Sequence, residues 1–240
     1  MDSVTMKQTQ VETRVNEFVR SVYNWMAIGL ALTGFTAYYA AHSEFLLNLL
    51  FSVEGNQMRP SMLFYGFIIS ELALVFFLSA RRQRLQASTA TLMFVVYAIL
   101  NGLTLSFVFL AYTGASVAST FFICAATFVV ASLFGWLTKR DLTSFGNFLF
   151  MGLIGIIIAS VVNIFLRSSM TYMIISYIGV LVFVGLTAYD TQHLKTMAMN
   201  QPDGLDGAVI RKGAIMGALK LYLDFINLFL MLLRILGNRR

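Results

Sequence analysis

Three acidic residues lie inside or at the edge of long apolar segments of this sequence: Glu71, Asp190 and Asp224. If such a segment crosses a membrane, an ionised carboxylate near its centre costs about 3 kcal/mol or more. Acidic residues in these places therefore mark paths for ions or protons more often than ordinary packing positions. Asp190 and Asp224 fall in the last two apolar segments, so this pair is the first candidate for a functional site.

The polar neighbours of the two aspartates leave more than one interpretation open. Asp190 and His193 share a face of a helix, which makes them a candidate metal or proton-relay pair; the alternative is a solvated histidine at the membrane interface. Lys220 precedes Asp224 by four residues. An internal pair of these two residues that merely neutralises both charges is the alternative to an ion or proton path.

Glu71 needs an inward orientation, a proton or a cation, because its neighbours in the sequence are apolar. Arg82 lies eleven residues further on, about three turns along the same face of a helix. The alternative is that the basic residues after this segment only anchor its end at the membrane surface, namely Arg81, Arg82 and Arg84.

The composition is that of a membrane protein, since 58% of the 240 residues are hydrophobic, 12% are charged and the mean hydropathy is +0.77. The apolar segments lack the alternation of barrel strands, so helices must satisfy their backbone. We predict an all-α polytopic protein that forms a single transmembrane domain over residues 1–240. Seven segments are long enough to span a bilayer, at about residues 22–41, 62–80, 90–112, 117–137, 148–166, 172–189 and 213–236.

The distribution of Lys and Arg predicts the orientation. They are frequent in the polar N-terminal tail, residues 1–21, and in every second loop, whereas the opposite loops carry only Arg59 and Arg167. This is the positive-inside pattern with a cytoplasmic N-terminus, and the tail lacks the apolar core of a cleavable signal. Seven crossings place the basic C-terminus outside, against the rule, whereas a re-entrant last segment returns it to the cytoplasm. We favour seven crossings.

Several classes of function find no support in the sequence. The net charge of +6 fits basic residues that face anionic lipid at the membrane surface, so we expect no nucleic-acid binding. The single cysteine, Cys124, excludes an intramolecular disulfide and a cysteine metal cage. The chain has no serine elbow, phosphate loop or metal-spaced histidine pair, so we expect neither an enzyme nor a resident cofactor.

Two motifs resemble those of the transmembrane Bax inhibitor family, and of its bacterial members most: Tyr189–Asp190–Thr191–Gln192, and the segment from Leu221 to Phe229 that contains Asp224. The resemblance covers essentially the whole chain. It implies a last helix wrapped by two layers of three helices, and an Asp190–Asp224 pair that senses pH and gates a calcium leak. Glu71 and Arg82 match positions of the second helix, where Arg82, or Arg81 in its place, would latch an aspartate in the closed state.

Two carboxylates close together in an apolar interior cannot both stay charged cheaply, so the pair should share a proton. We expect full deprotonation to attract Ca²⁺ weakly to Asp190 and Asp224, with Glu71 on the ion path, and to favour opening. The prediction is a pH-sensitive, calcium-permeable leak channel of the bacterial inner membrane, with Ca²⁺ as the transported ion.

Two other classes remain as alternatives. One is a non-conducting regulatory protein that binds a membrane partner such as a quality-control protease through its tails and loops. The other is a retinal protein with Lys220 as the attachment site. The only tryptophans, Trp25 and Trp136, disfavour the retinal protein because they fall near the ends of the apolar segments rather than around a chromophore.

Overall fold

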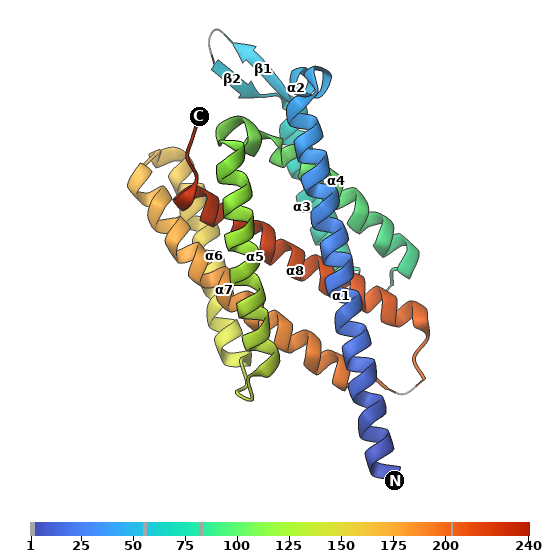
Figure 1. Cartoon of the computed structure of the whole chain (residues 1–240). Coiled ribbons are helices and arrows are strands. Elements are labelled where there is room, and N and C mark those ends of the chain that lie inside the picture. Colours follow the sequence, from blue (N-terminus) through green and yellow to red (C-terminus); the bar gives the residue numbers. More distant parts are fainter. Residues whose placement is uncertain (1–2, 55–56, 82–83, 203) are drawn as a thin grey trace. The chain divides into compact units, whose positions relative to one another are not determined.

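The computed structural model covers residues 1–240 and describes all of them except 1–2, 55–56, 82–83 and 203. For residues 3–9, 53–54 and 57–58 it describes the backbone only. The described residues form eight helices and one hairpin (Figure 1). In chain order these are α1 (Ser3–His42), α2 (Glu44–Leu50), β1 (Phe51–Glu54), β2 (Gln57–Pro60), α3 (Met62–Ala80), α4 (Ala87–Ala111), α5 (Gly114–Leu137), α6 (Thr143–Leu166), α7 (Ser169–Met199) and α8 (Gly207–Leu236).

Among the described residues, six helices are long and apolar enough to cross a membrane, α3 to α8. This confirms the prediction of a helical, polytopic membrane protein. The predicted first span, residues 22–41, lies within the longer helix α1, which is not one of the six. The count of seven spans and the arrangement in two layers around the last helix stay predictions.

The apolar segments predict where helices lie better than where they end. The predicted span 62–80 coincides with α3, but α7 continues ten residues beyond the predicted end at 189. Hydropathy marks the part of a helix that lies in hydrocarbon, whereas the backbone hydrogen bonds continue until a helix-breaking residue. Pro202, which cannot continue a helix, follows the end of α7 by three residues.

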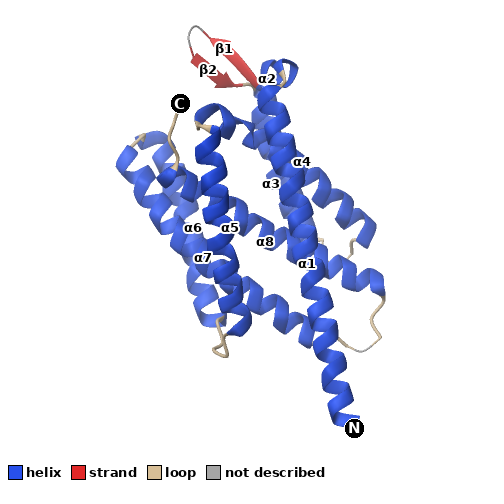
Figure 2. Ribbon diagram, in the orientation of Figure 1, coloured by secondary structure: helices blue, strands red, loops and turns tan. Residues whose placement is uncertain are grey.

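The hairpin that precedes α3 was not predicted. β1 and β2 pair antiparallel with Phe51 opposite Pro60, and they are the only strands of the described chain (Figure 2). Phe51 packs on Phe64 of α3, with ring centroids 5.4 Å apart. Ser61 ends the hairpin and caps α3, because its side chain accepts a hydrogen bond from the backbone N–H of Phe64.

The chain forms two compact units that interleave along the sequence. The first contains residues 1–19, 113–202 and 220–239, and therefore α5, α6, α7 and the second half of α8. The second contains residues 20–112, 203–219 and 240. It therefore contains most of α1, α2, the hairpin, α3, α4 and the first half of α8. The prediction of a single transmembrane domain stays a prediction.

Glycines let α7 pack closely on its neighbours in the first unit, where α5, α6 and α7 lie side by side (Figure 1). A Cβ atom on Gly135 of α5 would collide with the backbone carbonyl of Ala188. One on Gly146 of α6 would lie 2.5 Å from the ring of Tyr189. Both glycines thus contact the residues of α7 that immediately precede Asp190.

The helices differ in how much apolar surface they expose. In α3 and in α6 only 11% of the most apolar part of the helix is buried, and large side chains such as Phe76 and Ile157 are exposed. In α8 the corresponding fraction is 67%. Exposed apolar helix faces of this extent are suited to contact with lipid chains.

We expect Gly135→Ala to destabilise the first unit by about 1–3 kcal/mol, because the new methyl group meets backbone atoms of α7 that cannot rotate away. The measurement is thermal unfolding of the purified protein in detergent. Gly155→Ala in α6 is the matched control, since no atom lies within 4 Å of its Cβ position. Equal melting temperatures for the two variants would contradict the proposed close packing of α5 on α7.

Candidate aspartate-pair site

Asp190 lies in α7 and is almost fully buried, with a relative exposure of 1%. Its Oδ1 atom accepts a hydrogen bond from the Lys220 ammonium of α8 at 2.5 Å. The Lys220 side chain is 38% exposed, and its Nζ atom lies 5.2 Å from the centre of the Tyr189 ring. The charge of Asp190 is therefore balanced by a cation from the neighbouring helix.

Asp224 lies in α8 with an exposure of 6%, and its side chain lies within hydrogen-bonding reach of the Asp190 side chain. Two carboxyl groups can form such a bond only when one of them carries a proton, because an ionised carboxylate is an acceptor only. The structure thus brings together the two aspartates that the sequence analysis paired, and their arrangement is one in which a proton can be shared.

The predicted alternative of an internal Lys220–Asp224 pair is not what the structure contains. Lys220 bonds to Asp190 and acts on Asp224 through its charge alone. In the described part of the chain, the Oδ2 atom of Asp224 is buried and has no hydrogen-bond partner. Because an ionised carboxylate oxygen without a donor is costly to bury, Asp224 is better suited to hold the shared proton than Asp190.

Residues that follow Asp190 bind α7 to the end of α5 and to the segment between α5 and α6. The Gln192 side chain accepts a hydrogen bond from the backbone N–H of Leu142 and donates one to the carbonyl of Arg140, both at 2.8 Å. The Lys195 ammonium donates to the carbonyl of Trp136 at 2.8 Å and lies 4.8 Å from the centre of its ring. These contacts fix the position of α7 close to the aspartate pair.

His193 is exposed and stacks on Tyr189, with ring centroids 5.9 Å apart. It influences Asp190 through its charge rather than through a hydrogen bond between the two side chains. The i, i+3 spacing therefore places His193 near Asp190 on the same helix face, at the exposed edge of the site.

Glu71 belongs to the second unit, and α4 supplies its hydrogen-bond donors. Thr104 donates to its Oε1 atom at 2.8 Å and Asn101 donates to its Oε2 atom at 3.1 Å. Glu71 is thus oriented toward α4 and held by neutral donors. Its place on the ion path stays a prediction.

Arg82, predicted to latch an aspartate, lies outside the described residues. Arg81, the alternative, forms the C-terminal cap of α3, and its guanidinium carbon lies 5.4 Å from the centre of the Phe77 ring. The latch stays a prediction for either arginine.

Within the described residues, no group of three or more His, Cys, Asp and Glu side chains is arranged to hold a metal ion. A cation at Asp190 and Asp224 would therefore need water for its remaining ligands. The Cys124 thiol is buried 3.7 Å from the carbonyl of Phe225, in a packing position.

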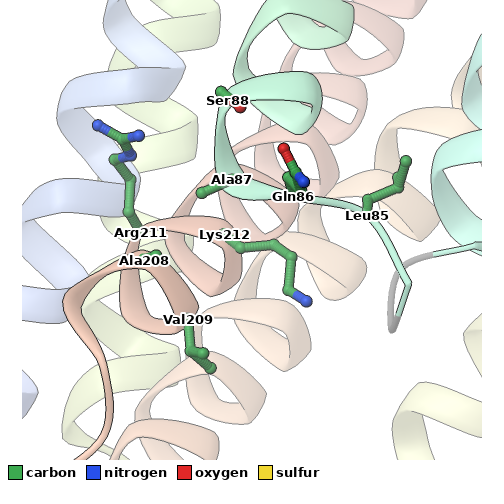
Figure 3. Close-up of a pocket in the computed structure, with 8 residues that line it drawn as sticks. All are labelled: Leu85, Gln86, Ala87, Ser88, Ala208, Val209, Arg211 and Lys212. Atoms are coloured by element: carbon green, nitrogen blue, oxygen red, sulfur yellow. The ribbon is translucent and has the colours of Figure 1, made fainter.

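Figure 3 shows a pocket of about 380 Å³ in the second unit, between the start of α4 and the start of α8. Lys212 extends beside Gln86, whereas Arg211 points in another direction. None of the predicted site residues lines this pocket.

The fold and the two motifs together define a class of polytopic membrane proteins with paired acids in the last two helices. Residues 15–240 match the family model "Inhibitor of apoptosis-promoting Bax1". Because the match covers most of the chain, the protein belongs to this Bax inhibitor family, as the resemblance implied.

Relatives in other bacteria extend over nearly the same length. Inner membrane protein YbhL of Escherichia coli is 52% identical over 239 residues, which cover 100% of this chain and 97% of that protein. The protein RP147 of Rickettsia prowazekii is 45% identical, with 99% and 96% covered. A protein of Deinococcus radiodurans is 42% identical, with 100% and 98% covered. The chain is accordingly an integral inner membrane protein.

We expect Lys220→Met and Asp190→Asn each to lower the free energy of unfolding by about 1–3 kcal/mol, because each leaves the other charge without its partner. The range lies below that of fully buried pairs, since Lys220 is 38% exposed. The double variant should lose less than the sum of the two single losses. Thermal unfolding of the unaltered protein, both single variants and the double variant at one pH measures these losses of unfolding free energy. Lys220→Arg keeps the cation and is the control; strict additivity of Lys220→Met and Asp190→Asn would contradict the ion pair.

Proposed function

We propose that this protein is a pH-sensitive, calcium-permeable leak channel of the inner membrane, gated by the Asp190–Asp224 pair. The observation that carries the proposal is the direct contact of these two carboxyl groups between apolar helices. Two adjacent carboxyl groups in an apolar interior titrate as one coupled unit, so the loss of one proton changes the charge of the whole site.

The closed state has a balanced charge. The Lys220 ammonium compensates the Asp190 carboxylate, and the proton shared with Asp224 neutralises the second acid. Lys220, Asp190 and Asp224 then have no net charge, which minimises the cost of the site in a low-dielectric environment. The shared hydrogen bond joins α7 to α8 and holds the closed arrangement.

Loss of the shared proton leaves two carboxylates against one ammonium. The two acids then repel each other, which favours separation of α7 and α8, and the net negative charge attracts a cation. Ca²⁺ prefers carboxylate oxygens, and two carboxylates completed by water bind it weakly enough for release. The Lys220 ammonium competes with Ca²⁺ for Asp190, so the lysine also limits occupancy of the site.

The test is Ca²⁺ flux through the purified protein in liposomes from acidic to alkaline pH. Flux of the unaltered protein should rise with pH by up to about tenfold per unit, because one proton is released. Asp190→Asn and Asp224→Asn should each flatten this profile, since neither leaves two acids to share a proton.

Asp141→Asn is the matched control. Asp141 is exposed in the segment between α5 and α6, and its carboxylate accepts hydrogen bonds from the Thr143 side chain and backbone N–H. These bonds hold the pKa of Asp141 below its ordinary value, so its charge does not change over the assay range. The pH profile of this variant should match that of the unaltered protein.

An unchanged pH profile in both Asp190→Asn and Asp224→Asn would overturn the gate. Folded protein that conducts no Ca²⁺ at any pH would overturn the channel itself, and would favour the regulatory protein with a membrane partner. Deletion of the N-terminal residues 1–17 does not distinguish the two functions, because it also removes the buried side chain of Val15, which is only 4% exposed, and so disturbs packing.

A further inference from the structure

A second pocket, of about 530 Å³, lies in the first unit, where α6 ends, α7 begins and α8 ends. Nine residues line it: Asn163, Arg167, Ser168, Ser169, Tyr172, Met173, Arg234, Gly237 and Arg239. Three of these are arginines and none is acidic. The lining therefore attracts an anion.

Two of the arginines converge on one aromatic ring. The guanidinium carbon of Arg234 lies 4.7 Å from the centre of the Tyr172 ring, and that of Arg239 lies 5.7 Å from the same point. These two distances together place the guanidinium carbons at most about 10 Å apart, a separation at which like charges repel and an anion that binds both is favoured. Arginine also forms paired hydrogen bonds to phosphate oxygens, so the two side chains are well placed for a phosphate group.

Arg167 and the start of α7 add to the positive potential of the pocket. Arg167 has a φ of 50°, in the left-handed region where glycine or asparagine is the usual residue at a helix end. α7 begins beside it, and the Ser168 side chain caps only the backbone N–H of Thr171. The positive end of the α7 dipole thus faces the same pocket as the third guanidinium.

Exposed apolar side chains adjoin the pocket in the sequence. Phe165 and Leu166 at the end of α6 are 80% and 63% exposed, and Met170 at the start of α7 is 73% exposed. The pocket therefore lies where an apolar helix surface ends, which is the depth of lipid headgroups in a bilayer. On the predicted topology this end is extracytoplasmic, where the positive-inside rule disfavours arginine, so a specific ligand accounts for the cluster better than orientation does.

We propose that this pocket binds a phosphate group, and that its position assigns the group to the headgroup of an anionic phospholipid. Arg234 and Arg239, both beside Tyr172, bind the phosphate, Arg167 and the start of α7 line the same pocket, and the acyl chains lie along the exposed apolar surface of α6 and α7. Lipid binding at this pocket does not depend on ion conduction at the aspartate pair.

The experiment is native mass spectrometry of the full chain in detergent, titrated with phosphatidylglycerol, phosphatidylcholine or inorganic phosphate. We expect phosphatidylglycerol to bind at least about tenfold more tightly than phosphatidylcholine. Arg234→Gln should weaken phosphatidylglycerol binding about tenfold, as should the double variant Arg167→Gln/Arg239→Gln, which alters only exposed residues and protects the test against misfolding. Arg59→Gln removes an exposed charge of the second unit and should change nothing.

Equal binding of the two lipids would overturn the assignment to an anionic headgroup. Inorganic phosphate that binds as tightly as phosphatidylglycerol, with the same dependence on the arginines, would overturn the lipid assignment. Arginine variants that bind phosphatidylglycerol as tightly as Arg59→Gln does would overturn the site.

Discussion

A carboxylate buried among apolar helices must be neutralised, and the surroundings of Asp190 satisfy this requirement. One neighbour supplies a cation and the other supplies a carboxyl group that can share a proton. Both neighbours come from α8, so the charge balance exists only while α7 and α8 are in contact. The glycine contacts of α7 with α5 and α6, and the hydrogen bonds of Gln192, hold the backbone of α7 where this contact is possible. Packing and electrostatics therefore depend on each other at this point of the fold.

The two units meet the same requirement in different ways. Glu71 receives hydrogen bonds from two neutral side chains, an arrangement that lowers the cost of the acid without a second titrating carboxyl group. Asp190 is held by a charged group and by a second acid, so a change of one proton alters the net charge of the cluster. In the second arrangement, loss of the shared proton makes two carboxylates on different helices repel each other, which is why the proposed gate is assigned to the aspartates.

Hydropathy predicted the helical membrane architecture, and the family resemblance implied the pairing of Asp190 with Asp224, which spacing in the sequence alone left open. The sequence did not predict the partner of Lys220. A spacing of four residues shows that Lys220 and Asp224 share a face of α8, but not which residue of a neighbouring helix lies opposite that face. The donors to Glu71 were missed for the same reason, although Asn101 and Thr104 are polar residues in an apolar segment. The hairpin was not predicted because strands of only four residues are too short to show an alternation of apolar and polar side chains.

Whether Asp190 and Asp224 share one proton can be measured by infrared spectroscopy of the protein with isotope-labelled aspartate carboxyl groups. A shared proton gives the C=O stretching band of one protonated aspartate per chain near neutral pH. This band should disappear on deprotonation at alkaline pH and be absent from Asp224→Asn at neutral pH, where Asp190 remains ionised against Lys220. A spectrum in which every aspartate is ionised at neutral pH, or in which Asp224→Asn keeps the band, would contradict the shared proton.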